Sequence, residues 1–215
     1  MHFRTKGFSL IELMIVLLVM GIIATIALPN MSHWIAKRKV LGKAEQAANL
    51  LHFSRAEAIR LGAPVYVCPV MVKTDGDIDK LPECSNQYLQ QGVAAYADVE
   101  KDGNYKRNSK DLDLRSLIIN EKNTSKIKYS LAAWPFDGQE TAVSVLGFLP
   151  SGAFGYGTVA GVNQLDWSTG SVRMIFTDVD DPSVSATVVI DSGGRSAVCV
   201  EGEQETRELC KTEKK

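Results

Sequence analysis

A single carboxylate lies within an otherwise apolar stretch near the start of the chain. Residues 8–28 read FSLIELMIVLLVMGIIATIAL, and apart from Glu12 only Ser9, Gly21 and Thr25 are not apolar. A helix of this length, at about 1.5 Å rise per residue, can just cross a hydrocarbon core of about 30 Å. A carboxylate inside that core costs roughly 2.5–3.5 kcal/mol, and a simple anchor gains nothing in return. We therefore expect Glu12 to have a function.

The apolar stretch follows a short basic leader. Residues 1–7 read MHFRTKG and carry Arg4 and Lys6, and positive charge before a span keeps that end in the cytoplasm. A secretory signal has an apolar core of roughly 7–15 residues followed by a small-residue cleavage site. This stretch is longer, and Leu28-Pro29-Asn30 does not have the A-x-A pattern. The sequence therefore predicts one membrane-crossing helix, with the rest of the chain on the far side of the membrane.

The cysteines are the next candidates for chemistry. Cys68, Cys84, Cys199 and Cys210 allow three complete disulfide pairings, and a translocated domain sits in an oxidising compartment. We favour the sequence-local scheme, Cys68 with Cys84 and Cys199 with Cys210, in which each small loop is worth about 3 kcal/mol in the chain-entropy model. A zinc site or a redox role is disfavoured because the chain has no C-x-x-C pair.

Two acidic alternations resemble the start of a calcium loop. Residues 98–103 read DVEKDG, with acidic residues at alternate positions and glycine in sixth place, but the twelfth position is Ser109 instead of a bidentate glutamate. Asp75, Asp77 and Asp79 form a second alternation without a completing ligand. We interpret both as turns and expect no metal site.

The chain has no motif of an enzyme. It contains no G-x-S-x-G, no H-E-x-x-H, no phosphate-binding glycine loop, and no histidine beyond His52. We therefore expect neither catalysis nor a cofactor. Lys and Arg number 24 against 25 Asp and Glu, which also argues against a strongly basic nucleic-acid binder.

A helix is expected to continue beyond the membrane. Within residues 30–61 the apolar positions recur at spacings of three, four or seven, which marks one helical face. These positions are Val40, Ala44, Ala47, Leu51, Ala58 and Leu61. Gly62 followed by Pro64 predicts the end of the helix, and Pro29, which has no backbone donor, predicts a bend.

Basic and aromatic residues gather on this helix just past the membrane. Lys37, Arg38, Lys39 and Lys43 follow Trp34, which is a candidate interfacial anchor. The cations could contact lipid headgroups or neighbouring subunits, but we favour a solvated helix face. His33 and His52 have no acidic or cysteine companion at ligand spacing, so we interpret them as surface or packing residues.

Short β-rich runs separated by turn signals make up the rest of the chain. The runs are residues 65–67, 92–97, 125–132, 141–148, 171–177 and 186–190. The turn signals are residues 74–76, 102–104, 150–152 and 192–194. Because no second amphipathic helix follows, parallel crossovers are disfavoured. We predict an α+β fold, with an antiparallel sheet or small β-sandwich packed on the apolar helix face.

The N-terminus resembles a known processing signal. Residues 6–13, KGFSLIEL, resemble the class III signal of type IV pilins and type II secretion pseudopilins: a basic leader ends in glycine, and glutamate is the fifth residue after the cut. Further segments resemble the FimT, FimU and GspH minor pilins, while residues 154–170 do not align. These segments are residues 54–60, 65–69, 92–98, 147–152 and 190–195. The resemblance implies a type IV pilin-like fold with a long bent N-terminal helix.

The resemblance also implies how the chain is processed and assembled. Prepilin peptidase would cut between Gly7 and Phe8, the new amino terminus at Phe8 would be N-methylated, and Glu12 would guide the subunit into a filament. Physically, Glu12 could pair with the Phe8 amine of a neighbouring subunit. The partners are then the peptidase, other minor and major pilins or pseudopilins, and inner-membrane lipid before assembly.

These expectations divide the chain into four parts. Residues 1–7 form the cleaved leader, 8–28 the transmembrane and filament-core helix, 29–62 its continuation, and 63–215 a β-rich periplasmic head. The protein would be stored in the bacterial inner membrane, with a single pass and the head in the periplasm. It would then enter a pilus or pseudopilus fibre.

The best interpretation is a minor pilin, a structural subunit of a type IV pilus or its tip-initiating complex. One alternative is a GspH-like pseudopilin of type II secretion. The other is a FimT-like DNA receptor, since some FimT-like pilins bind DNA through Gly-Arg-x-Arg near the C-terminus. Here residues 194–197 read GRSA, so the second arginine is absent and Arg195 alone is a candidate DNA contact. The tail after Cys199 mixes both signs of charge, which makes attraction to phosphates weak.

Overall fold

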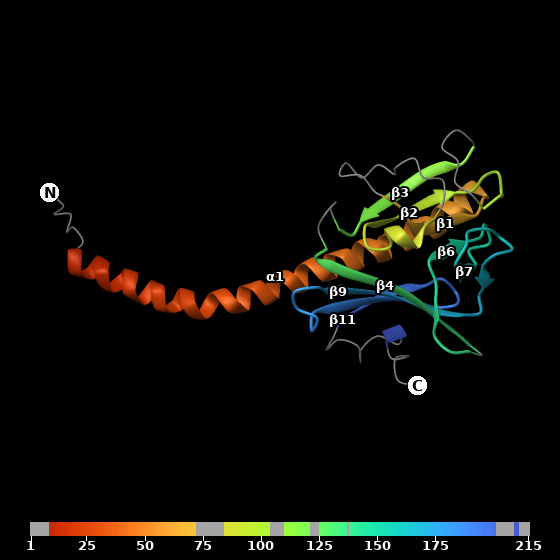
Figure 1. The fold of residues 1–215 in the computed structure, drawn as a ribbon. Coiled ribbons are helices and arrows are strands. Elements are labelled where there is room, and N and C mark those ends of the chain that lie inside the picture. Colours follow the sequence, from red (N-terminus) through yellow and green to blue (C-terminus); the bar gives the residue numbers. More distant parts are fainter. Residues whose placement is uncertain are drawn as a thin grey trace, which may run out of the picture.

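One long helix is the axis of the molecule. The computed structural model describes residues 9–71, 84–103, 110–120, 125–136, 138–200 and 209–210. Helix α1 (Leu10–Leu61) continues through Pro29 and is a bent rod whose N-terminal part projects away from the β-rich head (Figure 1). It ends where predicted: Gly62 is left-handed (φ 64°), and its N–H donates to the Ala58 carbonyl at 3.1 Å. Glycine adopts this conformation without a Cβ penalty.

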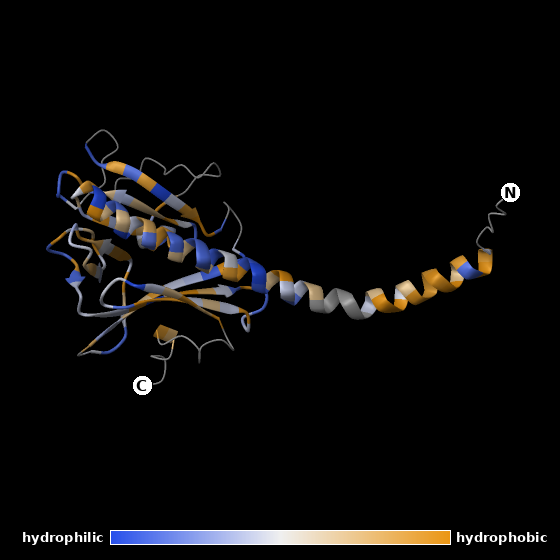
Figure 2. Ribbon diagram, turned by 180° about the vertical axis from the view of Figure 1, so that it is seen from behind, coloured by the Kyte–Doolittle hydropathy of each residue, from blue (hydrophilic) through white to orange (hydrophobic). Residues whose placement is uncertain are grey.

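The two ends of α1 have different surroundings. In the outer part, up to Ile35, the described large apolar side chains are exposed, and Figure 2 shows the N-terminal stretch of this part mostly in the hydrophobic colour. The inner part begins at Val40, which is 1 % exposed. The predicted face, including Ala44, Ala47, Leu51 and Ala58, is buried in the head, and Leu61 packs half-buried against it.

Two antiparallel sheets enclose the inner part of the helix. The six-stranded sheet has the order β3 (Leu112–Ile118), β2 (Gly92–Ala97), β1 (Val65–Pro69), β6 (Val145–Phe148), β7 (Phe154–Gly157) and β8 (Asp166–Trp167). The five-stranded sheet has the order β11 (Ser196–Val200), β10 (Ser185–Ile190), β9 (Gly170–Asp178), β4 (Ile127–Pro135) and β5 (Thr141–Ala142). A short 3-10 helix, η1 (Asn86–Tyr88), precedes β2. Strands of both sheets pack on α1 (Figure 1), so the expected α+β architecture is confirmed with the helix as a middle layer.

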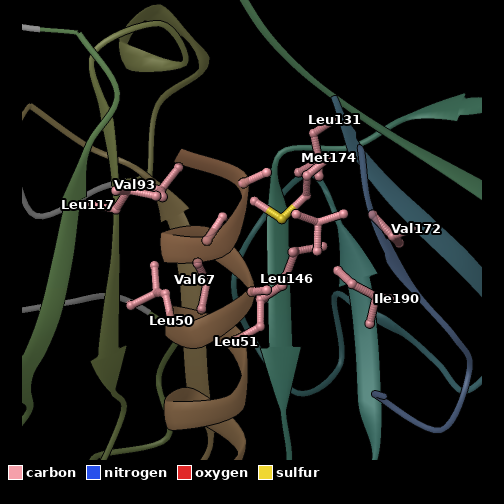
Figure 3. Packing of buried hydrophobic residues seen from close by; sticks show 14 of the residues in the cluster. Leu50, Leu51, Val67, Val93, Leu117, Leu131, Leu146, Val172, Met174 and Ile190 are labelled. Carbon is pink, nitrogen blue, oxygen red and sulfur yellow. The ribbon is translucent and has the colours of Figure 1, made fainter. Parts of the chain in front are cut away.

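The hydrophobic core forms on both sides of this helix. Leu50 and Leu51 point in different directions from the buried face of α1, because successive helical residues are rotated by about 100°. Figure 3 shows Leu50 on the side of Val93 and Leu117, and Leu51 on the side of Leu146. Burying each leucine stabilises the fold by roughly 1.5–3 kcal/mol. Val93, Leu117 and Leu146 all belong to the six-stranded sheet, and Ile190 of the five-stranded sheet belongs to the same core.

Most of the predicted β-runs are strands, with one correction and several omissions. The run 141–148 is not one strand, because it breaks after Ala142 into β5 and β6. Strand β3 was not predicted, since Asp113 and Arg115 make its sequence look like a loop. It is an edge strand with an exposed face, and the Arg115 guanidinium lies 5.6 Å from the Phe53 ring centroid. The strands β7, β8 and β11 were also missed.

Two amide side chains close the free edge of β4 where β5 does not reach. Gln90 donates to the Tyr129 carbonyl at 2.7 Å and accepts from the Tyr129 N–H at 2.8 Å. Asn120 donates to the carbonyls of Ile127 and Gln90, both at 2.7 Å, and accepts from the N–H groups of Ile127 and Lys126. These side chains take the place of a neighbouring strand and satisfy buried and half-buried backbone groups.

Replacing Asn120 by alanine should therefore destabilise the head by about 2–4 kcal/mol, because several buried backbone groups lose their only side-chain partner. Urea unfolding of the full chain in detergent, followed by near-ultraviolet circular dichroism, measures the change. Asn163→Ala, at an exposed position, is the matched control and should change the free energy of unfolding by less than about 0.5 kcal/mol. Equal stability of the two variants would contradict this account of the β4 edge.

Candidate functional site

Glu12 lies in the first turn of α1. Ser9 occupies the N-cap position with an extended backbone (φ −74°, ψ 144°) and makes no capping bond through its side chain. The first helical bond joins the Leu13 N–H to the Ser9 carbonyl at 3.2 Å. A carboxylate at this end is favoured by the positive pole of the helix dipole. Gly7 and Phe8, the predicted processing site, lie outside the described residues.

The surroundings of Glu12 are apolar and open. Its neighbours Leu10 and Leu13 are 77 % and 56 % exposed, and Glu12 itself is exposed. Within the described parts of the chain, Glu12 makes no hydrogen bond and no ion pair. The subunit thus presents an unneutralised carboxylate on an apolar helix surface. Among the described residues, no helix has the combined length and apolar character of a membrane span.

The region where α1 enters the head is held by polar contacts. The His33 Nδ1 lies 2.9 Å from the carboxylate of Asp181, which is 148 residues away in the sequence, so His33 is a surface residue with an acidic partner that spacing along the chain does not indicate. Hydrogen bonds from Ser183 and His33 lower the pKa of Asp181. Lys43 is not simply solvated, because its Nζ donates to the Ile118 carbonyl at 2.6 Å. His52, the other histidine of α1, has its Nε2 atom 3.1 Å from the Ser196 hydroxyl.

The cysteines form two disulfides. Cys68 is bonded to Cys84 and Cys199 to Cys210, with Cα separations of 5.4 and 5.8 Å. This is the sequence-local arrangement. The first bond ties β1 to the segment before η1, and the second ties Cys210 to β11, where both sulfurs pack with Val189. The disulfides therefore tie chain segments outside the main core to the head.

The acidic run at residues 98–103 forms a tightly bonded loop. Asp98 accepts from the N–H groups of Asp102 at 3.1 Å and Gly103 at 2.8 Å. Burial raises the pKa of the Asp98 carboxyl, while these N–H bonds oppose the shift. Asp111, which the sequence did not indicate, accepts from the N–H groups of Val99 and Glu100. Oxygen atoms of Asp98, Asp102 and Asp111 lie within 4.8 Å of one another.

Two of these carboxylates, those of Asp98 and Asp111, hold the loop together by accepting hydrogen bonds from its backbone. Asp98 is fully buried, and each of its oxygens already accepts a backbone N–H. Gly103 has a φ of 81°, and a Cβ there would lie 2.6 Å from the Ala160 carbonyl, so the loop fits closely against its neighbour. The other acidic run, Asp75, Asp77 and Asp79, lies outside the described residues.

Arg195 belongs to the turn between β10 and β11. Its Nε lies 2.7 Å from one oxygen of Asp191, and its N–H donates to the other oxygen at 2.8 Å. The guanidinium is exposed, but an acidic partner already neutralises it. The Arg55 guanidinium donates to the adjacent Gly194 carbonyl at 3.4 Å. The local geometry explains Arg195 as a turn residue and gives no specific support to a DNA contact.

A β-rich head that encloses the inner half of one long helix, and leaves an apolar outer half with a single carboxylate, is the architecture of type IV pilin-like subunits. Comparison with known families agrees with it. Residues 2–28 match the prokaryotic N-terminal methylation motif, and residues 43–200 match the family described as type II transport protein GspH. The chain belongs to this GspH family and is a type IV pilin or GspH-like pseudopilin subunit.

Individual relatives are more distant. The chain is 29 % identical over 166 residues to the type IV major pilin protein PilA of Myxococcus xanthus, covering 74 % of this chain and 66 % of PilA. The minor pilin FimU of Pseudomonas aeruginosa shares 12 % identity with a TM-score of 0.45, covering 80 % of this chain and 96 % of FimU. The minor pseudopilin EpsH of Vibrio cholerae shares 14 % identity with a TM-score of 0.44, covering 77 % and 99 %. The chain thus spans about two-thirds of PilA.

Removing the second disulfide should destabilise the chain by about 2–3 kcal/mol, because it cross-links residues only 11 apart. We expect the double variant Cys199→Ser/Cys210→Ser to unfold at a lower urea concentration than the wild type. The matched control adds a reductant to both proteins: the wild type then loses both disulfides and the double variant only Cys68–Cys84, so the two midpoints should converge. A double variant as stable as the wild type under oxidising conditions would contradict a stabilising role.

Replacing Asp98 by alanine should cost about 3 kcal/mol, since two backbone N–H groups lose a charged acceptor. Unfolding midpoints with and without a large excess of calcium test whether Asp98 bonds only to the backbone of the loop or also binds a metal ion. We expect calcium to leave the wild-type midpoint unchanged. Asp166→Ala, at an exposed acidic position, is the control and should be near neutral. A calcium-dependent rise that Asp98→Ala abolishes would instead make this loop a metal site.

Proposed function

We propose that the protein is a minor pilin, a structural subunit that is processed by prepilin peptidase and incorporated into a type IV pilus or its tip-initiating complex. One observation carries the proposed role as an assembling subunit: Glu12 lies exposed on an apolar helix surface, and no group in the described part of its own chain neutralises it. Such a surface is costly in water and requires an apolar environment. The carboxylate requires a cation in that environment.

Processing supplies the cation. Cleavage between Gly7 and Phe8 releases an α-amino group on Phe8, which remains basic after N-methylation. When outer helices pack side by side, the Phe8 amine of one subunit can approach the Glu12 carboxylate of its neighbour. Each charge then relieves the desolvation of the other, whereas either charge left alone in the bundle is strongly unfavourable. Only a processed subunit in the correct axial position satisfies both groups.

Storage in the inner membrane precedes assembly in this proposal. Residues 8–28 would lie in the bilayer, with Arg4 and Lys6 of the leader on the cytoplasmic side where the peptidase acts. Residues 29–62 would carry the helix out of the membrane, and residues 63–215 would form the periplasmic head. The exposed apolar outer part of α1 (Figure 2) would contact lipid first and other pilin helices afterwards.

A type II secretion pseudopilin is the second candidate, and the match of residues 43–200 to the GspH family favours it. The two candidates share the same processing and helix packing and differ in the machine that they enter. Deletion of the gene, scored in parallel for piliation, protein secretion and transformation, separates them. Loss of pili alone supports the minor pilin, loss of secretion alone the pseudopilin, and loss of DNA uptake with intact pili would instead support a DNA receptor.

Glu12→Ala should leave processing intact and reduce incorporation into filaments by roughly a hundredfold or more, because an unpaired buried charge costs about 3–5 kcal/mol. Immunoblots of sheared filaments and of membranes measure incorporation and storage. Glu12→Gln should behave like Glu12→Ala, since it also removes the charge. Glu45→Ala, an exposed glutamate of the same helix, is the matched control and should assemble normally.

Processing is scored separately from assembly. A substitution of Gly7 by serine or a bulkier residue should leave the precursor uncut and visible as a slower band on a gel. The two variants are expressed in separate strains. If Glu12→Ala enters filaments normally while Gly7→Ser stays uncut, the assembly role of Glu12 is refuted and the processing signal still stands.

A further inference from the structure

Three cations and a tryptophan surround α1 just before it enters the head. We call Trp34, Lys37, Arg38 and Lys39 the neck collar; all four side chains are exposed. Trp34, Lys37 and Arg38 share one face by their spacing of three and four, and Lys39 extends the charge around the helix. The Arg38 guanidinium lies 5.4 Å from the Trp34 ring centroid, in cation–π contact. The collar is thus a compact cationic surface with one aromatic edge.

The collar marks the boundary between two kinds of helix surface. On its N-terminal side Met31 continues the exposed apolar surface, which reaches into the collar at Ile35, while on its C-terminal side Val40 is buried in the head. Residue 37 lies about 13 Å beyond residue 28 along the helix at 1.5 Å per residue. Helical side chains lean toward the N-terminus, so the long cationic side chains lean back toward the apolar part.

The acidic groups facing the collar are largely engaged with the head. Those in the turn between β9 and β10 are Asp178, Asp180 and Asp181. Asp178 accepts from the N–H groups of the other two, and Asp181 pairs with His33. Asp180 and Glu45 remain as exposed acids near Arg38 in the grooves beside α1, together with the cations Lys43 and Lys126. The local sum stays positive, with five Lys or Arg against the four acids Asp178, Asp180, Asp181 and Glu45.

We propose that the neck collar binds the phosphates of anionic phospholipids at the outer surface of the inner membrane while the subunit is stored there. This inference rests on the proposed function, which places the apolar helix in a bilayer. Continuity of the collar with that helix and its positive charge identify the occupant as the headgroup layer. Arginine and lysine bind phosphate by charge-assisted hydrogen bonds, and tryptophan favours the membrane–water interface.

Lipid selectivity of the processed full chain tests the proposal. The chain is reconstituted into bilayers with spin-labelled phosphatidylglycerol or phosphatidylcholine, and the ratio of their association constants is measured by electron paramagnetic resonance. We expect a preference of roughly threefold or more for phosphatidylglycerol at low salt, falling as salt screens the charges. The variant Lys37→Gln/Arg38→Gln/Lys39→Gln should bring the ratio close to one. The matched control Lys101→Gln/Lys110→Gln/Lys128→Gln removes exposed head cations and should keep the wild-type ratio.

The outcomes separate the collar from the proposed function. A collar variant that keeps the wild-type ratio overturns the proposal. If it keeps that ratio but no longer enters filaments, the collar contacts neighbouring subunits instead of lipid. Glu12→Ala should keep the lipid preference, because Glu12 lies at the other end of the apolar stretch. Normal incorporation of Glu12→Ala would contradict the proposed function. The lipid ratios test the collar alone, so the two proposals can fail separately.

Discussion

Burial of one face of α1 between two sheets is the interaction on which the rest of the structure depends. Alanines at positions 44, 47 and 58 are fully buried and let the helix lie close to the strands, while Leu50 and Leu51 reach the two sides of the core (Figure 3). Each sheet covers a part of the helix that would otherwise be exposed apolar surface. The strands of the head therefore pack on the helix and fix its position relative to the head.

That arrangement assigns opposite tasks to the two halves of one helix. The inner half is anchored by the core and by the Lys43 bond to the Ile118 carbonyl, and the His33–Asp181 pair adds a contact just before it. The outer half leaves the head with its apolar side chains exposed (Figure 2). Since the helix continues between them, the position of Glu12 relative to the head is largely set by helix geometry. A pilin-like subunit needs this property, because contacts between helices must agree with contacts between heads.

The sequence predicts those features of the fold that depend on residues close together along the chain. The spacing from Val40 to Ala58, the stop at Gly62, the carboxylate at residue 12 and strands such as β2 follow from local patterns. Strand β3 was missed because an edge strand tolerates Asp113 and Arg115 on its exposed face. The pairs Gln90–Tyr129, Asp111–Val99 and His33–Asp181 depend on the tertiary fold. Spacing along the chain contains no signal for such pairs.

The central claim is that the Glu12 carboxylate of one subunit meets the Phe8 amine of another inside the filament. Solid-state NMR on filaments grown from a mixture of subunits, half labelled with ¹⁵N at the Phe8 amine and half with ¹³C at the Glu12 carboxylate, measures this distance directly. The account predicts dipolar transfer between the two labels, at a separation of about 4 Å. Filaments that show no transfer between labels on different subunits would contradict it.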